Sequence, residues 1–322
     1  MYHQIRTGVI GVGSMGQNHA RVYNEISDLI AVADPNEEQG REVASRLGVE
    51  WYSDYREMLQ NIDAVTVAVP TFLHLEVARD VADAGVHMLI EKPLSHSSAD
   101  AQEIVDIAHK KEVILAVGHI ERHNPVISFA KKGLKDGKWG NLITLSSKRV
   151  SNYPHRIKDV GVVFDLAIHD LDIISYLTDS QVVSLQAHGG SITNEGNVDH
   201  VSIIMDFQNG SNGIIEANWL TPMKVRELTL TCSKAYVILD YMDQSVSIKR
   251  LDSLELEEQN LWDAKYEIVE DKPTIKKYEP LKNELMDFLD CIEKSCEPMV
   301  TGAHGVRSVK LAEWANECIN DD

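Results

Sequence analysis

The chain has 322 residues and a formal net charge of −19, from 31 basic and 50 acidic side chains. At about 150 residues per domain, this length predicts two domains, and a hydrophobic content of 43% is typical of globular proteins. The acidic balance argues against partners such as nucleic acid or an anionic membrane, because both require basic protein faces. No apolar run approaches the roughly 18 residues of a spanning helix, and the N-terminus lacks a signal-peptide layout. We therefore expect a cytoplasmic protein.

The cysteines and histidines give little support for a metal. The cysteines form no CxxC pair, and their spacing matches neither a zinc ribbon nor a disulfide framework. His119 and His123 lie four residues apart and could hold a metal together with His169, but Asn124-Pro125 disfavours a continuous helix there. We expect reduced thiols and no metal site.

In the first 121 residues, short apolar runs alternate with helical periods. The predicted strands are 7–11, 29–34, 63–69, 87–90 and 113–117. The predicted helices are 15–26, 36–47, 73–84 and 98–110. Strands that are almost continuously Val, Ile and Leu, with helices between them, indicate a parallel sheet covered on both faces. We predict a doubly wound α/β domain over residues 1–121.

The pattern changes in the rest of the chain, where strands follow one another directly. The predicted strands are 142–150, 182–188, 198–207, 213–219, 227–232, 235–239 and 245–249. Several of them alternate apolar and polar residues, which is typical of an antiparallel sheet with one covered face. The predicted helices are 164–177, 281–294 and 305–319. We predict an α+β domain with a large open, mainly antiparallel sheet over residues 122–322.

A glycine-rich motif, GVGSMG, spans residues 11–16 between the first predicted strand and helix. Gly11 permits a tight turn, Gly13 allows the backbone to approach a pyrophosphate, and Gly16 allows close helix–strand packing. Asp34 ends the second strand, where a carboxylate binds the adenosine ribose diol and repels a 2′-phosphate. Because no Arg or Lys follows immediately, we favour NAD over NADP. The alternative is a structural turn that binds nothing or another nucleotide.

Three further motifs follow in order: Glu91-Lys92-Pro93 after a strand, G-H-x-x-R-x-N-P over residues 118–125, and D-x-x-x-H-D over residues 165–170. Together with the glycine motif they resemble the Gfo/Idh/MocA oxidoreductase family across essentially the whole chain. The resemblance implies NAD(P)-dependent oxidation of a secondary alcohol. The apolar side chains that alternate along these strands must be buried against something, so we also expect a homodimer or homotetramer through the open sheet face.

The expected catalytic residues are Lys92, Asp165 and His169. Asp165 and His169 share one face of a predicted helix, where the carboxylate can fix the imidazole tautomer. His169 then suits a general base, and Lys92 can stabilise a developing alkoxide. The resemblance implies the same three residues, but some relatives use the lysine as the base, so the proton acceptor stays open. Taken singly, the three residues could also be a loop lysine, a first-turn aspartate and an interior histidine.

The resemblance extends to the segment 69–74, which in the family lies along the cofactor. The expected cofactor contacts are Gly11, Gly13, Ser14, Met15, Gly16, Asp34, Pro70, Thr71, His74, Glu91 and Lys92.

Basic residues after position 119 suggest a substrate with a diphosphate. The alternative is that they form ordinary surface or dimer ion pairs. The expected substrate contacts are His119, Arg122, Asn124, Arg149, Arg156, Asp165 and His169. The E-R-x-N-P segment, residues 121–125, resembles the branch that contains UDP-N-acetylglucosamine 3-dehydrogenases, which implies a nucleotide sugar. The alternatives are a dehydrogenase of myo-inositol or another polyol or free sugar, and a catalytically inactive NAD-binding sensor. Many relatives have a glycine-rich stretch before the D-x-x-x-H helix, whereas this chain has Gly161 alone, so the substrate fit stays open.

Overall fold

The computed structural model describes residues 2–153, 160–193, 197–255 and 265–320. Contacts divide the chain into two compact units. Unit 1 comprises Met1–His123 and Glu279–Glu313, and unit 2 comprises Asn124–Tyr278 and Trp314–Asp322. Arg156, an expected substrate contact, lies outside the described residues.

The sheet of unit 1 has six parallel strands in the order β3-β2-β1-β4-β5-β6. Their bounds are β1 (Tyr2–Ile10), β2 (Ser27–Ala33), β3 (Glu50–Tyr52), β4 (Ala64–Val67), β5 (His87–Glu91) and β6 (Leu115–Gly118). This arrangement confirms the predicted doubly wound fold; the short edge strand β3 was not predicted. The strand order reverses at β1, between β2 and β4, and ligands of such sheets bind at this switch point.

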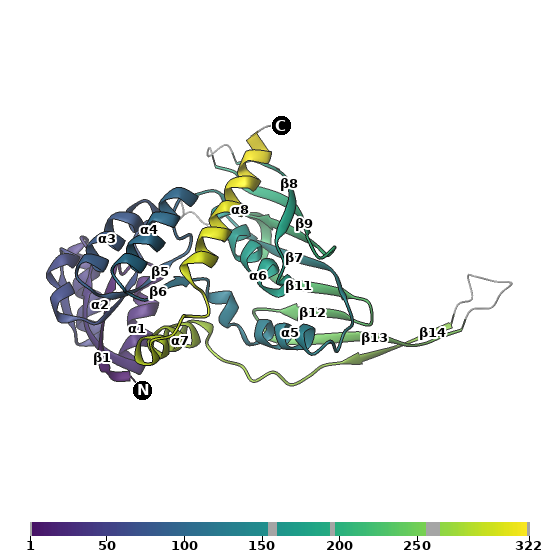
Figure 1. Ribbon diagram of the computed structural model, residues 1–322, viewed down its shortest axis with the longest axis horizontal. Helices are drawn as coiled ribbons and strands as arrows, with labels where there is room; N and C mark the ends of the chain where they lie inside the picture. The colour runs from purple at the N-terminus through teal and green to yellow at the C-terminus, as the bar shows by residue number, and fades with distance from the viewer. Residues whose placement is uncertain (1, 154–159, 194–196, 256–264, 321–322) are drawn as a thin grey trace. The chain divides into compact units, whose positions relative to one another are not determined.

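Helices cover both faces of this sheet (Figure 1). They are α1 (Gly16–Ile26), α2 (Glu37–Leu47), α3 (His74–Asp83), α4 (Ser98–Lys110), α7 (Pro280–Lys294) and the first part of α8 (Gly302–Asn320). Short 3₁₀ segments add η1 (Tyr55–Glu57), η2 (Leu59–Asn61), η3 (Thr71–Leu73) and η4 (Ile120–His123). The domain prediction of 122–322 put Glu279–Glu313 with the second domain, but this segment groups with unit 1 because α7 packs against α1 and η4.

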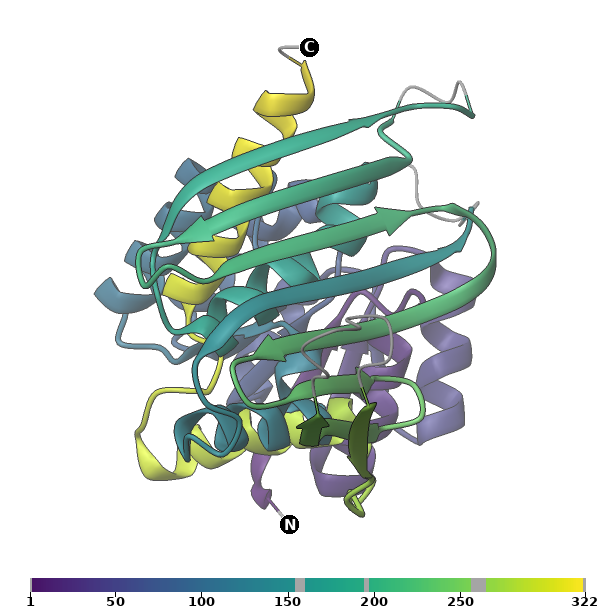
Figure 2. The same ribbon diagram turned by 90° about the vertical axis from the view of Figure 1, so that its right-hand side faces the viewer.

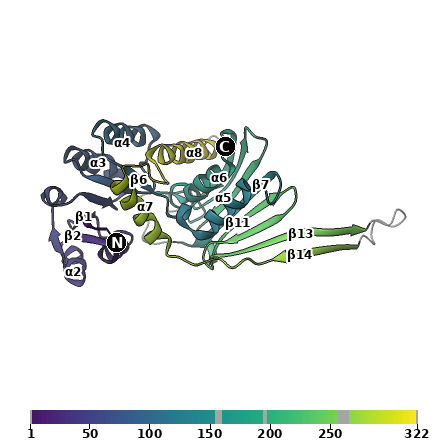
Figure 3. The same cartoon turned by 60° about the horizontal axis from the view of Figure 1, so that its bottom comes forward.

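The sheet of unit 2 has eight strands in the order β14-β13-β12-β11-β7-β10-β9-β8. Their bounds are β7 (Leu142–Asn152), β8 (Val182–Gly190), β9 (His200–Phe207), β10 (Asn212–Asn218), β11 (Leu220–Cys232), β12 (Tyr236–Asp240), β13 (Ser245–Glu255) and β14 (Lys265–Asp271). Only β10 and β7 are parallel neighbours among these strands, which confirms the predicted large, mainly antiparallel sheet. Figure 3 shows β13 and β14 as a pair at its edge; β14 was not predicted.

One face of the second sheet carries α5 (Pro125–Lys135) and α6 (Ile168–Thr178), and Figure 2 looks onto the other face. The predicted helix 164–177 is present, but its first turn, Val163–Ala167, is π-helical. The helix α5 was not predicted from the sequence. Asn124 is the N-cap of α5, accepting the Val126 N–H, and Pro125 occupies the first helical position, where proline is favoured. None of the described helices has the length and apolarity needed to cross a membrane.

Candidate active site

The glycine motif connects β1 to α1 at the switch point of the first sheet. Gly11 has φ +81°, and a Cβ there would lie 2.7 Å from the Ala68 carbonyl oxygen. A Cβ at Gly16 would lie 1.7 Å from the Gly11 oxygen, so both positions require glycine. A Cβ at Gly13 would meet no described atom within 4 Å. The backbone at Gly13 is therefore open to a phosphate, as the motif predicts.

The N-terminus of α1 differs from those of α2 and α4. Asn36 and Ser97 cap α2 and α4 with their side chains, whereas Met15 gives α1 no side-chain cap. Ser14 and Met15 are both exposed on this loop. The first-turn N–H groups of α1 thus have no side-chain acceptor at the cap, and such groups bind anions well.

Asp34 follows the end of β2 and lies at the glycine motif. Its Oδ2 accepts the Val12 N–H and its Oδ1 accepts the Asn36 N–H, each at 2.9 Å. A carboxylate oxygen has two lone pairs, so each oxygen keeps one for a further donor. Asp34 is half-buried and can still accept hydrogen bonds from a ribose diol.

The segment after β4 contains three expected cofactor contacts. Pro70 is exposed and precedes η3, and Thr71 is buried. The ring nitrogens of the buried His74 lie 3.2 Å from the Leu94 oxygen and 3.1 Å from the Val69 oxygen. Burial lowers the pKa of His74. His74 therefore links the segment after β4 to the segment after β5, and its direct contact with a cofactor stays a prediction.

The carboxylate of Glu91, at the end of β5, has two hydrogen-bond donors. Oε1 lies 2.8 Å from His19 Nε2, and Oε2 accepts the backbone N–H of Lys92 at 3.1 Å. Burial by itself would raise the pKa of Glu91, but the hydrogen bond and electrostatic interaction with His19, followed by those with Lys92, outweigh it, so the pKa of Glu91 is lowered. An ionised Glu91 thus holds the main chain at Lys92, whose side chain is half-buried.

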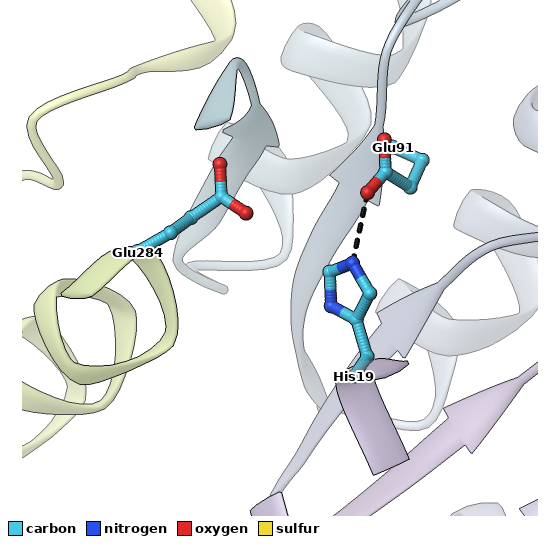
Figure 4. A group of neighbouring side chains, drawn as sticks. All are labelled: His19, Glu91 and Glu284. Atoms are coloured by element: carbon cyan, nitrogen blue, oxygen red, sulfur yellow. Dashed lines mark hydrogen bonds and ion pairs between the residues drawn. The ribbon is translucent and has the colours of Figure 1, made fainter. Parts of the chain in front are cut away.

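Glu284, on α7, completes a buried group with His19 and Glu91 (Figure 4). One nitrogen or oxygen atom from each of the three side chains lies within 4.8 Å of the others. The sequence analysis missed both His19 and Glu284. His19 could have been found, since it lies three residues after Gly16 in the motif helix, but nothing in the sequence links Glu284 to the Glu91-Lys92 segment.

The segment after β6 supplies further expected substrate contacts. His119 and Arg122 are buried in unit 1, and Arg122 Nη1 donates to the Met299 oxygen at 3.4 Å. Asn124, in unit 2, caps α5 and donates from Nδ2 to the Tyr241 oxygen at 3.1 Å. These contacts position the segment, and contact with a substrate stays a prediction.

The D-x-x-x-H-D motif lies in unit 2. Asp165 is half-buried in the π-helical turn, and its N–H donates to the Gly161 oxygen at 3.0 Å. His169 is buried in the first turn of α6. The structure therefore brings both residues into one helical segment, and π-helical turns are frequent at functional sites.

Arg149 forms a buried ion pair with Asp170, the last residue of that motif. Nε and Nη2 donate to the two carboxylate oxygens at 2.7 and 3.2 Å, and both side chains are 1% exposed. The guanidinium carbon also lies 5.2 Å from the Tyr241 ring centroid. The pair accounts for Arg149 without a substrate, so its expected substrate contact stays a prediction. The sequence analysis assigned no role to Asp170.

Comparisons with known proteins cover both units. Residues 5–119 match the family model described as an oxidoreductase family with an NAD-binding Rossmann fold, and residues 127–238 match the GFO/IDH/MocA C-terminal domain. UDP-N-acetylglucosamine 3-dehydrogenase from Acidithiobacillus ferrooxidans is 33% identical over 245 residues, 76% of each chain. The scyllo-inositol 2-dehydrogenase (NAD(+)) from Bacillus subtilis is 29% identical over 320 residues, 94% of this chain and 90% of that one.

A solved structure of the Acidithiobacillus ferrooxidans enzyme has a TM-score of 0.87 at 29% identity, covering 100% of this chain and 99% of that chain. The resemblance inferred from the motifs is confirmed. The chain belongs to the Gfo/Idh/MocA oxidoreductase family and is a nicotinamide-dependent dehydrogenase acting on CH–OH groups of a sugar or polyol.

Proposed function

We propose that the protein oxidises UDP-N-acetylglucosamine to its 3-keto derivative with NAD. The observation that carries this proposal is the 33% identity to an enzyme of that name, together with structural similarity along the whole chain. A second candidate is oxidation of an inositol, favoured by the scyllo-inositol dehydrogenase that matches 94% of this chain.

NAD rather than NADP is the proposed cofactor. Asp34 keeps acceptor capacity beside the glycine motif, and a 2′-phosphate there would meet its negative charge. The next residues, Pro35-Asn36-Glu37-Glu38, add two acidic side chains and no basic one. This charge pattern supports a ribose diol and disfavours a phosphate.

The proposed reaction removes a hydride and a proton from one carbinol group. NAD, held by the glycine motif and Asp34, would supply the acceptor for the hydride. His169 takes the hydroxyl proton, with Asp165 orienting its ring and stabilising the imidazolium. Lys92 donates a hydrogen bond to the reacting oxygen, which stabilises the alkoxide as the C=O bond forms. His119, Arg122, Asn124, Arg149 and Arg156 remain proposed contacts of the sugar or its diphosphate.

The test is a substrate panel with the purified protein and NAD. UDP-N-acetylglucosamine should produce NADH and a 3-keto product identified by mass spectrometry, and NADP should give lower activity. Turnover of scyllo- or myo-inositol without turnover of the nucleotide sugar would replace this proposal with the second candidate. NAD binding without turnover of any substrate would instead indicate a catalytically inactive sensor.

We also propose a homo-oligomer through the helix-free face of the second sheet. Gly213 faces Ile174 of α6, so the neighbouring Ile214 points to the opposite face, where its register partner Ile204 is also exposed. Leu251 is exposed there too. An apolar strand surface of this kind is expected to be covered in solution. Light scattering should give a dimer or tetramer mass, and a monomer at micromolar concentration would contradict the proposal.

A further inference from the structure

Glu91, which accepts the backbone N–H of Lys92, belongs to a buried group of three side chains. The other two are His19 of α1 and Glu284 of α7 (Figure 4). All three side chains belong to unit 1, and all three are buried. Burying charged groups is costly unless hydrogen bonds or opposite charges compensate for the lost water. The protonation state of each member therefore follows from its partners.

Glu91 has the partners of an ionised carboxylate. His19 Nε2 and the Lys92 N–H approach different oxygens of Glu91, at 2.8 and 3.1 Å. Two donors on two oxygens stabilise the charged form. The hydrogen on His19 therefore sits on Nε2 and points at Glu91.

Glu284 has the opposite surroundings. It is 2% exposed, and neither of its carboxylate oxygens has a hydrogen-bond partner among the described residues. Two carboxylates this close in a buried site cannot both ionise without a cation between them, so the one without donors keeps the proton. Burial, followed by the charges of Glu91 and Asp287, raises the pKa of Glu284 well above its usual range.

His19 has the acceptor that a protonated Glu284 needs. A ring with its one hydrogen on Nε2 presents Nδ1 as an acceptor, and Nδ1 has no partner among the described residues. In Figure 4 the Glu284 carboxyl group points toward the His19–Glu91 pair. A Glu284 oxygen lies within 4.8 Å of a His19 ring nitrogen, and one bridging water or a small side-chain rotation can bring the carboxyl group to Nδ1.

We propose that Glu284 is a neutral carboxylic acid that donates toward His19 Nδ1 and, through His19, keeps Glu91 ionised and Lys92 in position. Glu284 is thus a positioning residue for Lys92. The proposed chain of hydrogen bonds runs from the Glu284 carboxyl group on α7 through the His19 ring and the Glu91 carboxylate to the Lys92 N–H after β5. The proposal rests on the proposed function only in the catalytic role given to Lys92.

Other titratable and charged groups surround this chain. α7 packs against α1 and η4, and it also carries charged residues of its own. Besides Glu284, the groups on these elements and on the end of β5 include His19, Arg21, Tyr23, Glu25, Glu91, Lys92, Glu121, Arg122, His123, Lys282, Asp287, Asp290, Glu293 and Lys294. The Tyr23 hydroxyl stays uncharged near neutral pH, because burial raises its pKa above the usual range. On the exposed side, Lys282 pairs with Glu25 at 3.0 Å.

Infrared spectroscopy tests the protonation state without any substrate. The wild-type protein at about pH 7 should show the carbonyl band of a protonated carboxylic acid, and Glu284→Gln should lose it. Asp287→Asn, which removes a neighbouring carboxyl on the same helix, is the matched control and should keep the band. Absence of the band from the wild type, or its survival in Glu284→Gln, overturns the proposal.

Kinetics test the positioning role with two variants. Glu284→Gln stays neutral and can donate, so kcat/KM should stay within about twofold of wild type, whereas Glu284→Leu should lose about tenfold with NAD affinity unchanged. The alkaline limb of the pH profile should move upward in Glu284→Gln, because Gln cannot ionise. A purely structural role would leave that limb in place.

Three results would contradict the positioning role. These are a Gln variant as impaired as the Leu variant, superimposable wild-type and Gln pH profiles, and one equivalent of a metal in the wild type that Glu284→Gln lacks. If Glu284→Leu does not fold, the Gln variant and the infrared band still decide. If the wild type turns over no substrate, the proposed function fails. The infrared band still shows whether Glu284 is protonated.

Discussion

The two units bury charge in different ways. In unit 2, Arg149 and Asp170 satisfy each other through two hydrogen bonds, and their charges cancel. In unit 1, Glu91 has two donors, but Glu284 behind it has none among the described residues. A complete pair contributes a fixed local structure, whereas an incomplete group must hold or release a proton as its surroundings change. The Arg149–Asp170 pair therefore serves the architecture of unit 2, whereas the group of Glu284, His19 and Glu91 in unit 1 is proposed to position Lys92.

Breaking the complete pair should have the largest effect. Asp170→Ala leaves the Arg149 guanidinium buried and uncompensated, so the free energy of unfolding should fall by about 3–5 kcal/mol. Urea denaturation measures this loss. The double variant Arg149→Met/Asp170→Leu is the control, since it removes both charges and should recover most of the stability. A single variant that loses less than about 1 kcal/mol would show that the pair is not the architectural element described above.

Removing Lys92 should strongly reduce activity with little change in stability. Lys92→Ala deletes the proposed donor to the developing alkoxide, so kcat should fall about 100- to 1000-fold. Because Glu91 bonds to the backbone N–H of residue 92, that contact remains and NAD affinity should change little. Stopped-flow turnover and fluorescence titration with NADH measure the two quantities. Unchanged kcat would remove Lys92 from the mechanism.

Asp34 is intermediate between Asp170, which is fully paired, and Glu284, which has no donor among the described residues. Each Asp34 oxygen accepts one backbone N–H and keeps one lone pair. Asp34→Ser removes the charge and most of the acceptor capacity. The KM for NAD should rise about tenfold, and the NADP-to-NAD preference should rise further, because the repulsion of a 2′-phosphate is lost. Glu42→Ser, farther along α2, is the control and should leave the preference almost unchanged. Equal effects of both variants on cofactor preference would deny Asp34 its assigned role.

The sequence predicted the features that depend on short stretches of chain. The GVGSMG motif, the apolar strands around it and Asp34 lie within the first 34 residues, and the structure brings the motif and Asp34 together. The D-x-x-x-H spacing likewise placed Asp165 and His169 on one helical segment. Helical periodicity determines the Asp165–His169 pairing, and the parallel pairing of the first two strands brings Asp34 to the motif.

Contacts between distant segments were not predictable in this way. Glu284 lies 193 positions after Glu91 on α7, a helix whose sequence shows only an amphipathic pattern. The Arg149–Asp170 pair joins β7 to α6, and no motif specifies that register. Asn124-Pro125 was interpreted only as a helix break, although the same two residues cap and begin α5. A local signal can end one element and begin the next, and Asn124-Pro125 was interpreted only as an end.

The state of Glu284 should also appear in the pH dependence of stability. Burial and the charges of Glu91 and Asp287 raise the pKa of Glu284 in the folded protein far above its unfolded value of about 4.3. Between these two pKa values the folded protein holds a proton that the unfolded chain has released. The stabilisation is therefore complete below the unfolded pKa and is lost as pH rises toward the folded one.

Glu284→Gln cannot titrate, so its stability relative to wild type should rise by up to about 1.4 kcal/mol per pH unit through that window. Urea denaturation at several pH values between about 5 and 8 measures this difference. Asp290→Asn is the control on the same helix, because Lys294 and Tyr2 lower the pKa of Asp290 and the sign is reversed. Its contribution is present above the unfolded pKa and should stay constant over this range. Parallel curves for wild type and Glu284→Gln would mean that Glu284 is ionised in the folded protein, and the contrast between the two buried groups would then disappear.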